Sequence, residues 1–313
     1  MTIGIGASGP GAGLAVFRGL QAAEAVGRGS IRGFAVFAAI MPSGQLLYAE
    51  TQRGGSHTLF IEAETTGIDP TPQIQLATAA AIISSGPERP LPLRQFLAGE
   101  AQVGLVSGHR MPNRPGLSGM ALNAEALSLM AQGLPAATSV QKVLAANPDA
   151  DVGLIAIDRQ GGLYAQNSQR VSRRPDVGQA SRTHPITPAQ VAVLHNAIDP
   201  TPSLADLVAD IAIAEMGPPP IAGWITVSAP IPVIYGPENR ISVNEDGMAY
   251  EIMTTDLQLT QGRQLGSAIY LHSHVHAADQ VLGKTLVEPF CTVQDGILTE
   301  MSGQTTLRIS YTS

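Results

Sequence analysis

The stretch Ile68-Asp69-Pro70-Thr71-Pro72 recurs later in the chain as Ile198-Asp199-Pro200-Thr201-Pro202. An identity of this length is uncommon by chance, and internal repeats constrain a fold more than any local pattern. The sequence after each copy is rich in Ala and Ile and ends in Gly-Pro. Because Pro at the start and Gly-Pro at the end are typical helix signals, we predict helices over residues 73–85 and 203–216.

The sequence upstream of each copy repeats the same order of elements. Residues 2–9 and 102–108 each predict a strand of small residues that runs into a Gly-containing turn. An amphipathic helix follows each strand, and a strand pair with a short Gly turn follows each helix. The predicted helices and hairpins cover, in the first copy, about 14–26 and 33–51, and in the second, about 121–130, 137–145 and 152–167.

This repeated order predicts an α+β fold in which a β-α-β-β-α unit is used twice. With their helices outward, two such units would pack as an α-β-β-α sandwich. We place repeat 1 at about residues 1–100 and repeat 2 at about 101–220, within one domain of residues 1–220. Residues 221–313 alternate strands and turns and predict a mostly-β C-terminal part, with Pro218-Pro219-Pro220 as the boundary.

The amino-acid composition limits the kinds of binding partner and the cellular compartment that we expect. The net charge is −7, and the 18 Lys and Arg residues never occur in runs longer than two, so nucleic acid is not an expected partner. The apolar runs fall short of the ~20 residues that a membrane-spanning helix needs. The N-terminus shows no signal-peptide pattern, so we expect a cytoplasmic protein. The single cysteine, Cys291, excludes an internal disulfide and predicts a buried, inert thiol.

The second repeat carries several motifs in a distinctive order. They are Val103-Gly104-Leu105-Val106-Ser107, Asn113-Arg114-Pro115-Gly116, residues 126–133, Ala145-Ala146-Asn147-Pro148-Asp149 and residues 152–158 with Gly161-Gly162. This order, over about residues 101–168, resembles an uncharacterised bacterial family with the N-terminal-nucleophile hydrolase fold, and parts of the isoaspartyl peptidases. The resemblance implies the sandwich fold and leads to the hypothesis of an amidohydrolase or peptidase that cleaves a small amide.

Thr2 is the candidate nucleophile of such an enzyme. Aminopeptidases readily remove Met1 when residue 2 is small, which would leave Thr2 with a free α-amino group beside its hydroxyl. An amine with a pKa near ~8 is partly neutral at pH 7 and can act as the base. The alternative is an ordinary Thr at the start of a strand.

Two loops supply further candidates. After the first hairpin, Arg53, Gly54, Gly55 and His57 predict an anion-binding turn for a small-molecule ligand, against the alternative of an ordinary Gly-Gly turn.

In the second repeat, His109 is the candidate general base, Arg110 an anion clamp, and Asn113 and Asn167 candidate ligand-binding residues. The alternative is a solvated loop that precedes the helix. If the repeats pack with pseudo-twofold symmetry, this loop would meet its counterpart Ser8-Gly9-Pro10.

The C-terminal part contains His272, His274 and His276, which would share one face of a strand. Three such imidazoles could bind Zn²⁺ or another divalent metal, with Asp279 as a nearby supporting carboxylate. The alternatives are a polar edge strand or a subunit contact.

Three functional hypotheses follow. The first is the amide-bond hydrolase with Thr2 as its nucleophile. The second, a ring-opening amidohydrolase of the cyanuric acid hydrolase type, is rejected because that family pairs a Lys with a Ser in each repeat, and neither Lys142 nor Lys284 lies beside a repeated Ser. The third is a non-catalytic ligand- or metal-binding assembly protein, for example a homo-oligomer closed through its C-terminal part.

Overall fold

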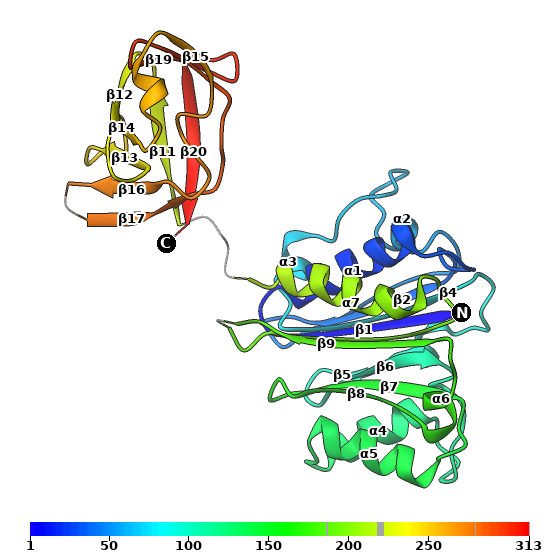
Figure 1. The fold of residues 1–313 in the computed structure, drawn as a ribbon. Helices are drawn as coiled ribbons and strands as arrows, with labels where there is room; N and C mark the ends of the chain where they lie inside the picture. Colours follow the sequence, from blue (N-terminus) through cyan, green and yellow to red (C-terminus); the bar gives the residue numbers. More distant parts are fainter. Residues whose placement is uncertain (186, 218–221, 279, 313) are drawn as a thin grey trace. The chain divides into compact units, whose positions relative to one another are not determined.

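The structure, a computed structural model, describes residues 1–185, 187–217, 222–278 and 280–312. The chain divides into two compact units, Met1–Gly217 and Pro218–Ser313 (Figure 1). The predicted boundary at Pro218-Pro219-Pro220 and the candidate Asp279 lie outside the described residues. Each unit is described by itself.

The first unit is an α-β-β-α sandwich, which confirms the predicted α+β fold (Figure 1). Its larger sheet has the strand order β3-β2-β4-β1-β10-β9 and is covered by α1 and α7, and its smaller sheet has the order β5-β6-β7-β8 and is covered by α4 and α5. The elements are β1 (Thr2–Ser8), α1 (Ala12–Val26), β2 (Ala35–Ile40), β3 (Leu46–Thr51), β4 (Ala79–Ser85), β5 (Ala98–Glu100), β6 (Gly104–Arg110), α4 (Leu122–Ala131), α5 (Ala136–Ala146), β7 (Val152–Asp158), β8 (Leu163–Asn167), β9 (Val177–Thr183), β10 (Gln190–Asn196) and α7 (Thr201–Ala214).

The two sheets approach each other closely because small residues line the face between them. A Cβ atom on Gly4 of β1 would lie 2.1 Å from the carbonyl oxygen of Gly108 on β6. A Cβ on Gly6 would lie 2.6 Å from the Ile155 side chain. Glycine is therefore required where β1 crosses the smaller sheet. This close packing fixes β1 at the centre of the sandwich and Thr2 at the end of that strand.

The helix predicted over residues 73–85 is wrong. Only one turn of helix, α3 (Pro72–Gln75), follows the first Asp-Pro-Thr-Pro, and the chain then forms β4, which pairs with both β1 and β2. Every residue of β4 is buried. A short apolar run that is buried on both faces has the same sequence pattern as a buried helix, so periodicity could not separate them.

The second Asp-Pro-Thr-Pro does begin a helix, α7. The segment between Arg170 and Pro188, for which no element was predicted, contains β9. Together with β10, this strand joins the larger sheet beside β1. Repeat 2 therefore completes the sheet of repeat 1 as well as forming its own. Short helical segments make up the remaining connections, at α2 (Ser56–Leu59), η1 (Leu93–Phe96) and α6 (Gln169–Ser172).

The second unit is mostly β, as predicted. Its strands form one ten-stranded sheet in the order β11-β20-β17-β16-β13-β14-β12-β19-β18-β15 around an apolar core. The elements are β11 (Gly223–Ser228), β12 (Ile231–Tyr235), β13 (Arg240–Val243), β14 (Ala249–Thr254), η2 (Leu257–Thr260), β15 (Arg263–Gly266), β16 (His274–Ala277), β17 (Gln280–Thr285), β18 (Cys291–Gln294), β19 (Ile297–Met301) and β20 (Thr306–Thr312).

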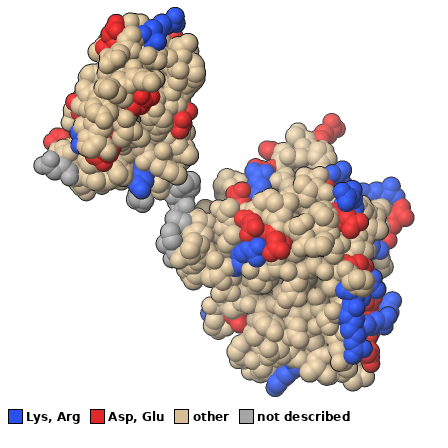
Figure 2. Space-filling model, in the orientation of Figure 1, with Lys and Arg blue, Asp and Glu red and all other residues tan. Residues whose placement is uncertain are grey.

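The described helices are all too short or too polar to cross a membrane. Acidic and basic side chains are interspersed on the visible surface, and most of that surface is uncharged (Figure 2). This distribution agrees with a charged content of only 14%.

Candidate functional site

A cavity of about 240 Å³ lies at the N-terminal end of β1. It brings together Thr2, Arg110 and Asn113, which the sequence singled out from both repeats. The remaining lining residues come from the neighbouring strands and loops: Met1, Phe34, Arg89, Pro90, Phe96, Met111, Asp151 and Asn196.

Thr2 occupies the centre of a polar row at the end of the larger sheet. It lies directly opposite Ser85 on β4 and directly opposite Asn196 on β10. Residues paired in this way place their side chains on one face, with Cβ atoms roughly 4.5–5.5 Å apart. Thr2 is 7% exposed, and the Asn196 Oδ1 atom is buried without a hydrogen-bond partner. The row therefore combines a hydroxyl with a carboxamide that has unused hydrogen-bonding capacity.

The residue before Thr2 is held inside this site. The Ser85 hydroxyl donates to the Met1 carbonyl oxygen, and the Arg89 guanidinium donates to Ser85 Oγ at 2.5 Å. Burial lowers the pKa of the amino terminus, and the positive charges of Arg110 and Arg89 lower it further. An amine at this end of β1 is thus shifted towards the neutral form that can accept a proton.

The two arginines of the cavity differ in their partners. Arg110 makes two hydrogen bonds to the Asp151 carboxylate, at 2.5 and 2.7 Å, and these bonds lower the pKa of Asp151. Arg89 forms no ion pair with any described residue and lies 5.8 Å over the Phe34 ring. Its charge is therefore available to an anionic group in the cavity.

His109 lies beside the cavity and not in it. Its side chain points between the sheets, where Nε2 is 2.6 Å from Asn167 Oδ1 and Nδ1 has no hydrogen-bond partner. Complete burial lowers its pKa to about 4. The ring fits because residue 153 is glycine, where a Cβ atom would lie 2.5 Å from the imidazole. The imidazole is neutral at pH 7 and does not line the cavity.

The Gly-Gly turn is outside the cavity. The Arg53 guanidinium pairs with Glu88, and His57 Nε2 lies 2.9 Å from the Thr66 hydroxyl. Gly54 and Gly55 both have positive φ, and a Cβ on Gly55 would lie 1.9 Å from the Glu24 carboxylate. These glycines therefore make room for a buried acid.

That acid, Glu24, holds the turn against α1 by accepting hydrogen bonds from the Ser56 N–H and hydroxyl, at 3.1 and 2.5 Å. Burial raises the pKa of Glu24. The adjoining Gln52 side chain makes two hydrogen bonds to the backbone of Arg89, at 2.6 and 3.0 Å. The turn thus holds the backbone of Arg89, which lines the cavity, but the turn itself does not line the cavity.

The sequence analysis missed three polar residues that line the cavity, Arg89, Asp151 and Asn196, and also Ser85, which pairs with Thr2 beside it. Ser85 and Arg89 were missed because β4 was predicted to be a helix. Asn196 ends a buried apolar strand that was not predicted, and a polar residue at such a strand end was the signal that could have found it.

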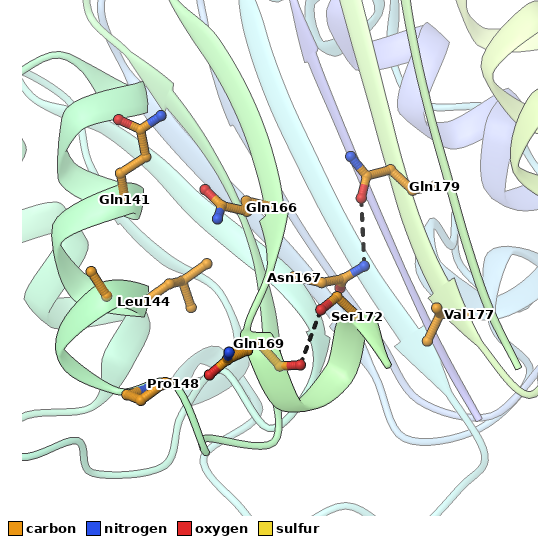
Figure 3. A pocket seen from close by; sticks show the side chains of 10 residues that line it. Gln141, Leu144, Pro148, Gln166, Asn167, Gln169, Ser172, Val177 and Gln179 are labelled. Carbon is orange, nitrogen blue, oxygen red and sulfur yellow. Dashed lines mark hydrogen bonds between the residues drawn. The ribbon is translucent and has the colours of Figure 1, made fainter. Parts of the chain in front are cut away.

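A larger hollow of about 820 Å³ opens between α5, β8, α6 and β9 (Figure 3). Gln141, Gln166, Gln169 and Gln179 line it together with Asn167, the partner of His109. Its lining has no charged side chain and no nucleophile other than Ser172. The smaller cavity at Thr2 is therefore the better candidate for chemistry, despite its size.

In the second unit, potential metal ligands gather at Glu238, His274 and His276, with their ligand atoms all within 4.8 Å of one another. Glu238 Oε2 lies 3.0 Å from His274 Nδ1, and this hydrogen bond lowers the pKa of Glu238. The His276 Nε2 atom is buried without a partner.

The prediction of a three-histidine metal site is wrong for His272. His272 has a φ of 65° and precedes β16, so the alternation along the strand does not extend to it. The Glu238 side chain, from the loop after β12, takes its place in the cluster.

Most of the chain matches known protein families. Residues 2–224 match a family described as a domain of unknown function, DUF6963. Residues 230–306 match a second family, also described as a domain of unknown function, DUF7259. A search of curated proteins found no match.

Proposed function

The chain belongs to the DUF6963 family, a domain of unknown function, and we propose that its first unit is an N-terminal-threonine amidohydrolase that cleaves a small amide. The observation that carries the proposal is the position of Thr2, flanked by Ser85 and Asn196 at the cavity. The proposal requires a free α-amino group on Thr2, so whatever precedes Thr2 must be removed.

The reaction follows from this arrangement. The Thr2 Oγ atom attacks the carbonyl carbon of the amide while its proton passes to the Thr2 α-amine. The carboxamide of Asn196, next to Thr2 across the ladder, donates to the oxygen that becomes negative. The C–N bond breaks, the departing amine takes the proton from the α-amine, and water then hydrolyses the ester on Thr2.

The cavity favours a small, anionic substrate. Its volume of about 240 Å³ is below the roughly 300–1,000 Å³ of most ligand pockets. Arg89 supplies a positive charge without a carboxylate partner among the described residues, whereas Asp151 neutralises Arg110. A substrate with a carboxylate near its amide bond matches this distribution of charge.

The test combines intact-protein mass spectrometry with an amide-cleavage assay. We expect a mass that corresponds to a chain beginning at Thr2, and release of ammonia or amine from a panel of carboxylate-bearing amides. Thr2→Ala should abolish turnover, and Thr2→Ser, which keeps a hydroxyl and an α-amine, should retain it. A protein that still carries Met1 and nevertheless turns over the amides would refute the role of Thr2.

For the second unit, we propose that Glu238, His274 and His276 bind Zn²⁺. One carboxylate and two imidazoles are a zinc-type donor set, and the buried, unpartnered Nε2 of His276 gives a reason for a ligand. Elemental analysis of tag-free protein should find one zinc per chain. His276→Asn should lose it, and His272→Asn should keep it, since His272 is outside the cluster. Equal metal content in both variants would exclude this site.

A further inference from the structure

The two sheets of the first unit differ in width, and the wider sheet overhangs at both edges. β10 packs against β8, whereas β9, the next strand outward, meets the smaller sheet through a hydrogen bond that the Asn167 amide of β8 donates to Gln179 Oε1 at 3.5 Å. At the other edge, η1 packs over β2 and β3, and Leu93 and Phe96 are buried there. Thus one overhang is closed by the chain itself, and the β9 overhang is left open.

The open overhang forms a channel made of two hollows that meet at Gln179. The hollow of about 820 Å³ (Figure 3) and a second one of about 290 Å³ both lie along β8 and β9, and Gln179 lines both. Val177, Gln179 and Ser181 alternate along β9 on the side that faces the channel. The channel therefore runs parallel to two strands, in the space that a further strand of the smaller sheet would fill.

β8 offers a free backbone edge to this space. The Ser168 N–H donates to the Val152 carbonyl, and the Asp158 N–H donates to the Gly162 carbonyl, so the even-numbered residues of β8 bond to β7. The N–H and C=O groups of Leu163, Ala165 and Asn167 then point away from β7. β8 is the last strand of its sheet, so these groups have no partner strand within the described chain.

The side chains of the channel suit a polypeptide backbone. Gln141, Gln166 and Gln179 present carboxamides, each of which can donate and accept hydrogen bonds as a peptide group does. The one charged lining residue, Arg182, is bound by Asp206 and Asp210 of α7. The channel thus selects for backbone and for small uncharged side chains.

We propose that this channel binds an extended, uncharged peptide segment of a partner protein, which adds to the free edge of β8 and lies over β9. A second copy of this chain fits less well. In such a dimer, the β8 strands of the two copies would pair edge to edge. The β9 strand of the second copy would then overlap the β10 strand of the first copy, which already packs over β8. The channel therefore has room for a single strand, but not for a strand that belongs to a larger sheet.

The test uses a phage-displayed library of random heptapeptides, followed by fluorescence polarisation with the enriched peptides. Ala165→Pro removes an outward N–H and no bond to β7, so the fold should persist, which circular dichroism checks. Ala165→Ser keeps that N–H and is the matched control. We expect Ala165→Pro to weaken binding at least tenfold and Ala165→Ser to change it less than twofold.

N-methylation of alternate peptide residues gives an independent readout. N-methylation at the positions whose N–H groups face β8 should abolish binding, and N-methylation at the intervening positions should be tolerated. Failure to enrich any peptide, or equal affinity for the proline and serine variants, would overturn the proposal. Concentration-dependent dimers that Ala165→Pro abolishes would overturn it in favour of self-association.

Discussion

His109 Nε2 and Asn167 Oδ1 lie 2.6 Å apart between the two sheets, and this bond keeps a neutral imidazole in a fully buried position. Burial lowers the pKa of His109 to about 4, below its ordinary value of 6.5. Between these values the unfolded chain binds a proton that the folded chain excludes.

Stability should therefore be complete above about pH 6.5 and should fall as the pH drops towards 4, by about 3 kcal/mol for this histidine. Urea unfolding across this range measures the slope. His109→Gln should make the slope shallower and leave the contribution of His195, whose pKa burial also lowers to about 4. An identical slope in the His109 variant would contradict the assignment.

Arg89 should control substrate affinity more than turnover. If its free charge holds a substrate carboxylate, Arg89→Gln should raise KM about tenfold or more with a smaller change in kcat. Steady-state kinetics on an amide cleaved by the unaltered enzyme provide the measurement. Arg53→Gln is the matched control, because Arg53 pairs with Glu88 outside the cavity. Equal effects of both substitutions would remove Arg89 from the site.

The contact between Gly4 and Gly108 should be highly sensitive to added volume. Gly4→Ala places a methyl group 2.1 Å from the Gly108 carbonyl oxygen, so the sheets must separate, at a cost of about 3 kcal/mol or more. Chemical denaturation of the purified variants tests this. Gly266→Ala, where no atom lies within 4 Å, should cost less than about 1 kcal/mol. A stable Gly4→Ala protein would show that the sheets are less tightly packed.

Cys291 should be unreactive in the folded protein. It is fully buried, and burial raises the pKa of its thiol, so little thiolate is exposed to reagents. A chromogenic disulfide reagent should label it only at the rate at which the second unit opens, and rapidly in guanidinium chloride. Rapid labelling without denaturant would show that this part of the core is accessible.

The sequence correctly predicted the helices and strands whose pattern was long or bounded by turns. The helices α1, α4 and α5 and both hairpins form where amphipathic periods and Gly turns predicted them. It failed at β4, because a run buried on both faces carries no period that distinguishes strand from helix. That one error concealed Ser85 and Arg89.

The site residues show the same division. Thr2 and Arg110 could be chosen by their chemistry and their places at strand ends, and the fold brings them to one cavity. Asn196 and Glu238 were not chosen, because each reaches its neighbours only through pairing between distant parts of the sequence. Local patterns do not encode such pairing, so it must be read from the folded chain.

The return of β10 to the sheet of the first repeat has a consequence for the order of assembly during synthesis. β1 leaves the ribosome long before β10, its partner strand with Asn196, which emerges only near the end of the second repeat. The strand that carries Thr2 therefore keeps one unpaired edge until nearly the whole first unit has been made. A chain that stops early would carry the threonine but not the pocket, which confines any amide cleavage to completed molecules.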